Sequence, residues 1–434
     1  MRSDRWPGRS WYADEAGPDC TGAAPLSGEV TVDVAVIGGG LAGMTTALNC
    51  LERGIDRVAL IEADEVGAGA SGRNGGFVFS GFSLSNDSLA DQLGDKAAAR
   101  LHEWTRQSVH RIRQRIEDYR LDCQANDAGV VLTDWFHDAD ALRAFADRMR
   151  KRLGFELTWR DPADCAALVN SERYGAGLHE PGSFHFHPLR HIRELARHFI
   201  EQDGALYSQT RVAAIERAHG CWQLKTARGQ VTAKEVVLTT GGYDLKLRPA
   251  LQRALQPIAT YIAVTEPLDS RLDDALPQPV AVYDNRFAFD YYRPLPDRRL
   301  LWGGRISIAS RSPAAIRRLM RRDLSRVFPA LADVSLEQAW GGWMSYARHE
   351  MPILGQDAEG LWHGLAFGGH GMATTSLAGD LLAEALTGDR RRLDEFQRWG
   401  TPWAGGPLGR LAVQAHYWQL QARDRWRGRH SRVG

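Results

Sequence analysis

The clearest hydrophobic pattern in the chain lies between residues 32 and 64. A β-branched apolar run at 32–38 predicts a buried strand, and the apolar positions of 41–53 predict a helix that ends at Gly54. A second apolar run at 57–64 predicts another buried strand. Because strand, helix and strand follow each other closely, they form a βαβ unit whose right-handed crossover makes the two strands parallel.

The rest of the chain alternates between helical and strand-like patterns. Apolar side chains recur three or four positions apart at 95–121, which predicts a long amphipathic helix. Further helices are expected at 191–207, at 314–327 and in the last patterned segment, which follows a strand and a glycine loop and closes at Gly388.

Two regions carry most of the remaining strand signals. Residues 210–244 alternate like a small antiparallel sheet that returns to a buried strand at 235–239, and a β-rich block covers residues 255–345. The sequence therefore predicts an α/β (α+β) fold. Residues 1–29 are aperiodic, and we expect an irregular N-terminal arm that lies against the body of the protein.

Composition and charge exclude several classes of protein. The chain has 434 residues, 25% of them charged, and its net charge of +1 supplies no global field for a polyanion. The basic stretch 423–434 is interpreted as a solvated or docked terminus in preference to a nucleic-acid site, because no partner motif surrounds it. We therefore expect no nucleic-acid partner.

Cysteine usage and hydropathy point to the cytoplasm. The five cysteines are scattered, odd in number and without C-x-x-C or Cys/His spacing, which argues against a disulfide framework and against zinc. No stretch approaches 18 uninterrupted apolar residues, and acidic residues interrupt the first thirty positions, where a signal peptide needs an apolar core. We expect a cytoplasmic protein with no membrane span.

A glycine motif joins the first strand to the first helix. Gly38, Gly40 and Gly43 have the G-x-G-x-x-G spacing that allows a tight turn, a close approach to a pyrophosphate and close helix–strand packing. Glu62 ends the second strand, where an acidic side chain accepts hydrogen bonds from a ribose. Together these features favour a dinucleotide site over a merely structural turn.

A second small-residue loop distinguishes between the dinucleotides. It follows Glu62 directly and contains Ser71, Arg73 and Asn74 in the segment "EADEVGAGASGRNGGF". A nicotinamide dinucleotide has no need for so long a second cradle, whereas a flavin dinucleotide continues past its pyrophosphate to a ribityl chain and a ring. The sequence therefore favours FAD.

At this point the sequence resembles a known family, the D-amino-acid-oxidase-like flavoproteins, which include glycine and sarcosine oxidases. The motifs "GASGRNGG", "WGG" at 340–342 and "GGHGMATTSLAGDLLAEAL" are most similar to its γ-glutamylputrescine oxidoreductase branch. The resemblance implies a Rossmann-like FAD-binding domain, and a set of cofactor-binding positions: Gly38, Gly40, Leu41, Ala42, Gly43, Glu62, Ala63, Ser71, Arg73, Asn74, Gly75, Gly76, Val212, Gly241, Gly369, His370, Gly371 and Met372.

The resemblance also implies a reaction. The neutral amine of the substrate passes a hydride from its α-carbon to flavin N5, the imine hydrolyses, and O2 reoxidises the flavin to give H2O2. The flavin carries the redox chemistry, so the protein mainly orients the substrate and tunes charge. A γ-glutamylated amine, a polyamine or an amino-acid-like substrate is expected.

One departure from the family concerns the attachment of the flavin. Monomeric sarcosine oxidases bind flavin through a cysteine in the region of "GGWMSYARHEMP", where this chain has Met344, Ser345 and Tyr346. The nearest cysteine in the sequence is Cys221, and no histidine lies in the "GAGASGRNGG" loop. Noncovalent FAD is therefore expected.

Five residues are candidates for contact with the reacting groups. They are His370 at a helix start, Tyr291 and Tyr292 on an alternating strand, Arg305, and Arg348. Each has a structural alternative: a cap for His370, core packing for the tyrosines, and a surface position for the arginines.

Two further groups of side chains are candidates for binding an amine or a metal. Asp284 and Asp290 are acidic positions suited to attract a cationic amine. His185, His187 and His191 suggest a metal at first sight, but Pro188 and the lack of an acidic partner argue against one, and no metal is expected.

The expected domain organisation is discontinuous. The FAD-binding domain combines 30–82, 180–250 and 345–400, the substrate domain combines 83–179 and 251–344, and 401–434 form a C-terminal tail. Two alternatives to an oxidase remain. One is a dehydrogenase of the same fold that passes electrons to a quinone or an electron-transfer protein, and the other is a non-catalytic flavin-binding regulatory or complex subunit.

Overall fold

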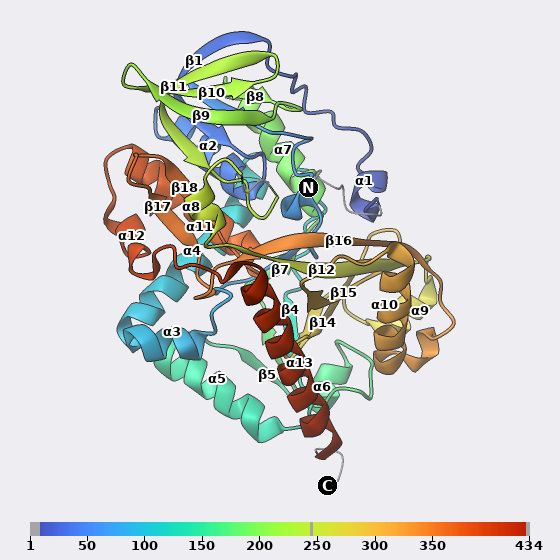
Figure 1. Cartoon of the computed structure of the whole chain (residues 1–434). Coiled ribbons are helices and arrows are strands. Elements are labelled where there is room, and N and C mark those ends of the chain that lie inside the picture. Colours follow the sequence, from blue (N-terminus) through green and yellow to red (C-terminus); the bar gives the residue numbers. More distant parts are fainter. Residues whose placement is uncertain (1–8, 244–245, 431–434) are drawn as a thin grey trace.

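A computed structural model describes residues 9–243 and 246–430 of the chain (Figure 1). Its first large sheet has the strand order β17-β18-β11-β1-β2-β8, and β10 and β9 extend it as a hairpin beside β11. These strands are β1 (Gly28–Ile37), β2 (Val58–Ile61), β8 (Ala205–Tyr207), β9 (Val212–Ala218), β10 (Cys221–Thr226), β11 (Gly229–Leu238), β17 (Ile353–Gln356) and β18 (Trp362–Leu365).

The βαβ unit expected from the sequence is present. Strand β1 pairs in parallel with β2 on one side and with β11 on the other, and α2 (Leu41–Glu52) connects β1 to β2. Helices α11 (Gly371–Leu386) and α7 (Pro188–Glu201) pack against α2, which explains why almost all of α2 is buried. The α/β fold class is confirmed.

More helices complete this half of the molecule. The amphipathic helix expected at 95–121 is α4 (Asp95–Asp118), which packs against α11 and also contacts α3 (Asn86–Leu93) and α5 (Ala139–Leu153). Its buried positions, among them Leu101 and Ile112, join the largest hydrophobic core together with the inner residues of α2 and α11. Of the shorter helices, α8 (Pro249–Gln252) and α12 (Arg391–Asp394) also belong here, whereas α6 (Pro162–Ala166) lies beside the second sheet.

The second large sheet has the order β16-β12-β15-β14-β13-β4-β6-β5. Its strands are β4 (Val130–Thr133), β5 (Thr158–Arg160), β6 (Gly177–Glu180), β12 (Gln256–Thr265), β13 (Ala281–Asp284), β14 (Asp290–Pro294), β15 (Leu300–Ser307) and β16 (Leu336–Tyr346). Helices α9 (Ser270–Ala275) and α10 (Pro313–Val327) contribute to the core on one face of this sheet, where Trp302, Ile316 and Met320 are buried.

A two-stranded ribbon links the two halves. It consists of β3 (Phe77–Val78) and β7 (Phe184–His185). The buried guanidinium of Arg293, on β14, donates hydrogen bonds to the carbonyl oxygens of Gly75 (2.6 Å) and Phe186 (2.9 Å) and to the hydroxyl of Tyr12 (3.1 Å). One side chain therefore joins the second sheet, the ribbon and the N-terminal arm.

The expected helix at 191–207 was wrong at both ends. Helix α7 begins at Pro188, where the His187 side chain caps it, and ends at Glu201. Asp203 adopts a left-handed backbone, and the chain then forms β8, which pairs in parallel with β2. An apolar stretch of three residues cannot reveal such a long-range pairing by itself.

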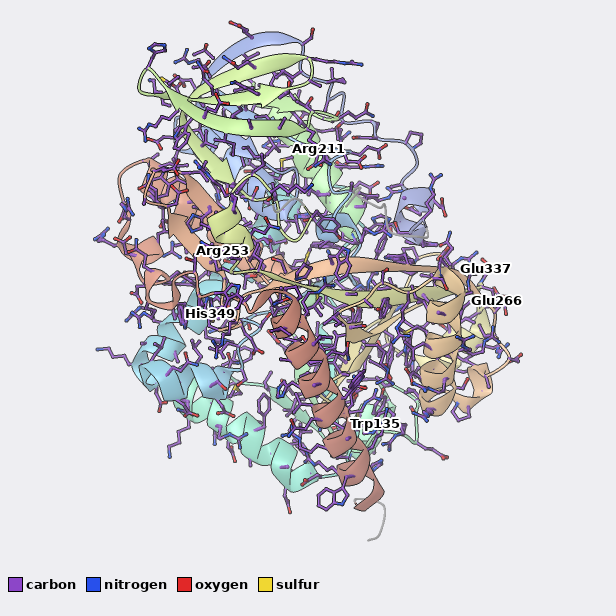
Figure 2. The ribbon with its side chains drawn as sticks, in the orientation of Figure 1. Trp135, Arg211, Arg253, Glu266, Glu337 and His349 are labelled. Atoms are coloured by element: carbon purple, nitrogen blue, oxygen red, sulfur yellow. The ribbon has the colours of Figure 1, made fainter. Side chains whose placement is uncertain are left out.

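The terminal segments contain helices. The arm includes α1 (Trp11–Glu15), whose Trp11 and Tyr12 are buried. The expected tail forms α13 (Gly406–His430), which crosses the second sheet, and Trp135 lies near its C-terminal end (Figures 1 and 2). Asp424 accepts a hydrogen bond from the backbone of Phe287 (2.8 Å).

Ion pairs and exposed apolar residues also characterise α13. Arg427 pairs with Asp138 at 2.8 Å, so the described part of the basic stretch 423–434 docks on the protein; residues 431–434 lie outside the described residues. On its outer face, Leu408, Trp418 and Trp426 are each more than half exposed. The domain boundaries themselves stay a prediction. In the described part of the chain, no helix is long and apolar enough to cross a membrane.

Buried histidines make the fold sensitive to acid. His191 stacks on Phe186 with 4.5 Å between ring centroids, and burial lowers its pKa to about 3. The folded protein therefore excludes a proton that the unfolded chain binds below pH 6.5, so this histidine contributes stability at pH 7 that is lost as the pH falls. We predict that His191→Phe reduces the difference in unfolding free energy between pH 7 and pH 5 by about 2 kcal/mol.

The measurement is urea unfolding of both proteins at each pH. His110→Gln, which removes an exposed histidine from α4, is the matched control and is expected to leave the difference unchanged. An equal pH dependence in wild type and His191→Phe would show that this buried imidazole does not control acid stability.

Candidate functional site

The glycine turn after β1 brings backbones closer together than side chains permit. Gly38 has φ +116°, and a Cβ there would lie 2.8 Å from the carbonyl oxygen of Thr239 at the end of β11. A Cβ on Gly43 would overlap the Gly38 carbonyl oxygen. Helix α2 therefore starts directly against the ends of β1 and β11.

Helix α2 begins without a capping side chain. Gly40 is the N-cap residue and has no side chain to cap the helix, and a Cβ there would lie 3.0 Å from Ser71 Oγ. The same Ser71 hydroxyl accepts a hydrogen bond from the amide of Leu41 at 2.8 Å, and Ala42 follows in the first turn. Helix amides and the positive end of the helix dipole here suit an anionic group.

Glu62 lies beside this turn. Its carboxylate accepts hydrogen bonds from the amides of Gly39 (2.6 Å) and Asp64 (2.8 Å), and burial raises its pKa. Ala63 lies between these acidic residues. The Glu62 carbonyl accepts a hydrogen bond from the Thr210 amide, which brings the start of β9, and hence Val212, to the same edge of the sheet.

The second loop is held in shape by its own side chains. Asn74 donates hydrogen bonds to the carbonyl oxygens of Ala70 (3.1 Å) and Ser71 (2.9 Å), and it accepts one from the Gly76 amide (2.8 Å). The amide of Asn74 therefore supports the loop from within. A Cβ on Gly75 would lie 2.7 Å from the Tyr291 ring, so glycine is needed for this close approach.

Arg73 ties this loop to the second sheet. Its Nε donates to the Gly341 carbonyl oxygen (3.0 Å), and Trp340 Nε1 donates to the Arg73 carbonyl oxygen (3.0 Å). Burial lowers the pKa of the guanidinium. The "WGG" motif is therefore the part of β16 that receives the loop. Gly241, in the turn after β11, has φ +60°.

A third glycine loop precedes α11. The Gly369 amide donates to Ser83 Oγ (2.9 Å) and the Gly368 amide to the Ser345 carbonyl oxygen (2.9 Å). His370 is the N-cap residue of α11 but makes no side-chain cap bond, and the helix continues with Gly371 and Met372. Burial lowers the pKa of His370 to about 4, so its imidazole is neutral at pH 7.

Strand alternation separates the two candidate tyrosines. Tyr291 faces the glycine loops, while Tyr292 is fully buried on the other face, where it stacks on Trp302 with 4.4 Å between ring centroids. Gly303 lies directly beneath the Tyr291 ring on the neighbouring strand. Tyr292 therefore belongs to the core of the second sheet and does not face the loops.

Tyr291 belongs to a continuous row of rings, which we call the aromatic arc. Each ring in the arc lies within 6.1 Å, centroid to centroid, of the next, in the order Phe77, Tyr291, Phe289, Tyr283, Phe79 and His370. All except Phe77 are half-buried, although they lie deep between the second sheet and the glycine loops. The arc therefore presents partly exposed rings to the space between the second sheet and the loops.

The other charged candidates do not reach this space. Arg305 pairs with the buried Asp323 at 2.6 Å, and Arg348 is exposed. Asp284 and Asp290 are fully buried and both bind the guanidinium of Arg286 at 2.5 Å. The expectation that these aspartates attract a cationic amine was wrong, because both are buried and already hydrogen-bonded to Arg286, which leaves neither open to a ligand.

The three histidines considered for a metal have separate partners. His185 Nε2 lies 2.9 Å from the Pro279 carbonyl oxygen, His187 pairs with Glu15 at 3.0 Å, and His191 stacks on Phe186. Among the described residues, no group of three or more His, Cys, Asp or Glu side chains is arranged to hold a metal ion.

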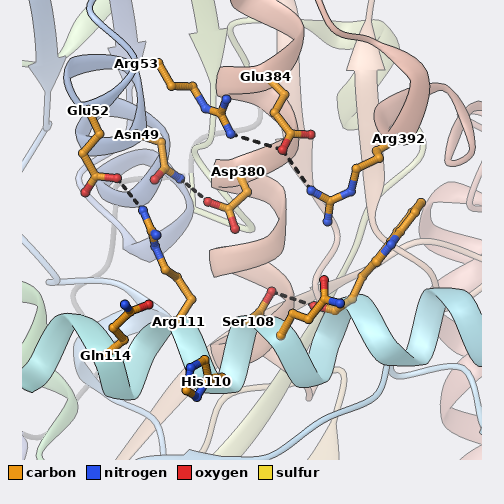
Figure 3. A pocket seen from close by; sticks show the side chains of 12 residues that line it. Asn49, Glu52, Arg53, Ser108, His110, Arg111, Gln114, Asp380, Glu384 and Arg392 are labelled. Carbon is orange, nitrogen blue, oxygen red and sulfur yellow. Dashed lines mark hydrogen bonds and ion pairs between the residues drawn. The ribbon is translucent and has the colours of Figure 1, made fainter.

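A separate polar pocket opens at the opposite end of α2 (Figure 3). Its charged side chains are already paired, because Arg53 binds Glu384 (3.1 Å) and Arg111 binds Glu52 (2.7 Å). It lies between α2, α4 and α11, away from the glycine loops, and it is not part of the site.

Sequence reasoning missed several residues of this space. Tyr283, Phe79 and Phe289 were not singled out, although alternation in β13 places Tyr283 on the same face as Tyr291. Glu180, at the end of β6, was also missed. A single sequence does not show which face of a strand looks toward a loop that is two hundred residues away.

The three glycine loops fit FAD. An adenine dinucleotide with a long extension requires three features, and the chain has each of them. Helices α2 and α11 start without a side-chain cap, an acidic side chain lies beside the first turn, and glycines line the second loop. The arc then lies where the ring system of such a cofactor would meet a substrate.

Comparison with known proteins agrees with this fit. The family model described as "FAD dependent oxidoreductase" (DAO) matches residues 33–385. The chain is 32% identical to the gamma-glutamylputrescine oxidoreductase of Escherichia coli over 404 residues, which cover 92% of this chain and 94% of that protein. It is 30% identical over 427 residues to the probable oxidoreductase OrdL of Haemophilus influenzae, with 96% and 98% of the two chains covered.

Solved structures show the same fold. The glycine oxidase of Geobacillus kaustophilus superposes with a TM-score of 0.71 at 21% identity, covering 85% of this chain and 98% of that one. The L-proline dehydrogenase of P. horikoshii gives a TM-score of 0.71 at 18% identity, covering 87% and 98%. With its glycine loops, its sheet order and the family match over most of its length, this chain belongs to the DAO family of FAD-dependent oxidoreductases.

Proposed function

We propose that this protein oxidises the carbon–nitrogen bond of an amine, with noncovalent FAD as the cofactor and O2 as the acceptor that yields H2O2. A γ-glutamylated amine, a polyamine or an amino-acid-like amine is the proposed substrate. The observation that carries the proposal is the aromatic arc, which faces the glycine loops from the second sheet. Similarity to a gamma-glutamylputrescine oxidoreductase supports the substrate class.

The residues of the site fit the roles that this reaction leaves to the protein. FAD, when bound, supplies the two-electron acceptor. The rings of the arc exclude water and give an alkyl amine a surface against which its reacting carbon is oriented. Burial raises the pKa of Tyr283 and Tyr291, so both hydroxyls remain protonated, and neutral His370 places no positive charge beside the amine.

Noncovalent binding is supported by the residues around the third loop. Tyr346, whose pKa burial raises to about 12, lies with its hydroxyl close to Gly369. Met344 and Ser345 are its neighbours on β16, and the described cysteines lie elsewhere in the chain. No thiol of the described residues is thus placed to attach a flavin here.

Glu62 tests the assignment of the dinucleotide. We predict that Glu62→Gln raises the dissociation constant for FAD about 10- to 100-fold, because a hydrogen bond to a charged group contributes about 1.5–3 kcal/mol. The measurement is a titration of the apoprotein with FAD, in which the quenching of flavin fluorescence reports binding.

The control for this titration is Glu235→Gln. Its carboxylate accepts a hydrogen bond from Trp362 Nε1 (2.8 Å) within the first sheet and does not face the glycine turn. An unchanged dissociation constant in Glu62→Gln would show that this carboxylate does not contact FAD.

Denaturation of the holoprotein tests the attachment of the flavin. Flavin that stays with the denatured chain would contradict noncovalent binding.

The reaction is tested with the holoenzyme under anaerobic conditions. The panel contains 1,4-diaminobutane, its γ-glutamyl derivative, a longer polyamine, 1-aminobutane, glycine and sarcosine. We predict that at least one of the polyamine or γ-glutamyl compounds bleaches the flavin band, and that air restores the band promptly with formation of peroxide.

Other outcomes separate the alternatives. Bleaching followed by slow reoxidation in air favours a dehydrogenase that uses a quinone or an electron-transfer protein. A yellow protein that no amine bleaches favours a non-catalytic flavin-binding subunit. A protein that takes up no FAD would overturn the proposal as a whole.

A further inference from the structure

A carboxylate that the reaction has not yet used lies at one end of the aromatic arc. Glu180 is the last residue of β6, and its cross-strand partner is Val130, which in turn is the partner of Ala281. Val130 and Ala281 pack with Phe77 under the arc, so this register places the Glu180 side chain on the face of the sheet that looks toward the glycine loops.

The surroundings of Glu180 are polar, and the nearest opposite charge, on Arg106, lowers its pKa only as a minor influence beside burial. Ser80 Oγ donates a hydrogen bond to Glu180 Oε1 at 3.3 Å, and the same hydroxyl lies 3.5 Å from His102 Nε2. Burial lowers the pKa of His102 to about 4, so this imidazole is neutral at pH 7. In the part of the chain that the structure describes, no arginine or lysine forms an ion pair with Glu180; the nearby Arg106 is exposed and pairs with Glu103 at 2.7 Å.

Glu180 is nevertheless accessible. Its side chain is half-buried, as are Tyr283 and Phe79, although burial is the main influence on its pKa, which is raised. The carboxylate therefore faces the same internal space as the arc. The hydroxyls of Ser80 and Ser183 and the charge of Arg106 only partly offset desolvation, so a cation that pairs directly with this carboxylate would stabilise its ionised form further.

We propose that Glu180 binds a positively charged ammonium group of the substrate, with the rings of Tyr283 and Phe79 beside it. Carboxylates form charge-assisted hydrogen bonds with ammonium groups, and aromatic faces attract the same cations. This inference rests on the proposed function, since it names the class of amine that the arc accepts.

The bound ammonium is not the nitrogen that is oxidised. The amine to be oxidised must be neutral, and a carboxylate next to it would favour its protonated form. Glu180 is therefore suited to a second nitrogen, which stays protonated while the first one reacts near the loops. The substrate class is thus an amine with a second ammonium group that is protonated at neutral pH, as in a diamine, a polyamine or an amine that also carries an α-ammonium.

The test compares two ligands with the same four-carbon chain, 1,4-diaminobutane and 1-aminobutane, in anaerobic stopped-flow experiments. The dependence of the bleaching rate on amine concentration yields a dissociation constant and a limiting rate separately. In Glu180→Gln we expect the dissociation constant of the diamine to rise at least about tenfold, that of the monoamine to change less than about twofold, and both limiting rates to be retained. If the panel identifies another substrate, that compound and its analogue with the second ammonium replaced by methyl form the pair.

Two controls keep the result interpretable. Glu180→Gln is expected to fold and to retain FAD, because the substitution preserves the shape of a side chain whose neutral form burial already favours. Glu235→Gln, in the other sheet, is expected to bind both ligands as the wild type does.

Several outcomes would overturn the inference. These are an equal loss of affinity for both ligands, a loss confined to the limiting rate, or a best substrate with a single positive charge. Each can occur while the wild type oxidises amines, so it leaves the proposed function intact. Failure of every amine to bleach the wild-type flavin would instead remove the proposed function, and this inference with it.

Discussion

The buried guanidinium of Arg293 is the interaction on which the arrangement of the site depends. Within residues 9–243 and 246–430 it forms no ion pair with a carboxylate, and it donates instead to the Gly75 and Phe186 carbonyl oxygens and to the Tyr12 hydroxyl. Because a buried charge is costly unless hydrogen bonds compensate it, the guanidinium holds these three acceptors close together. The second glycine loop is thereby fixed against β14, and Tyr291 of the same strand lies against that loop.

Local patterns predicted the parts of the fold that local sequence determines. The βαβ unit, α4 and α10 follow from apolar spacing within each segment. The pairing of β8 with β2 and the helix α13 did not follow. Strand β8 is too short to have a period of its own, and α13 docks by scattered polar contacts such as that of Asp424, with apolar residues on its outer face.

The site was predictable where backbone geometry requires a residue type. Gly38 and Gly43 occupy positions that no side chain can fill, so the sequence marks them. The side chains proposed to face a substrate occupy positions where many residue types fit. The pairing of Asp284 with Arg286 and the absence of an ion pair at Glu180 among the described residues both depend on three-dimensional neighbours, which a single sequence does not show.

The order of the first sheet has a consequence for the nascent chain on the ribosome. Strand β1 is made early, but its neighbour β11 is completed only at Leu238, and β18, which flanks β11, only at Leu365. Helix α11, which supplies the last of the three glycine loops, follows still later. Synthesis must therefore continue past Met372 before the three glycine loops can come together, so the complete pair of helix starts beside the first sheet forms only after both sheets have been made.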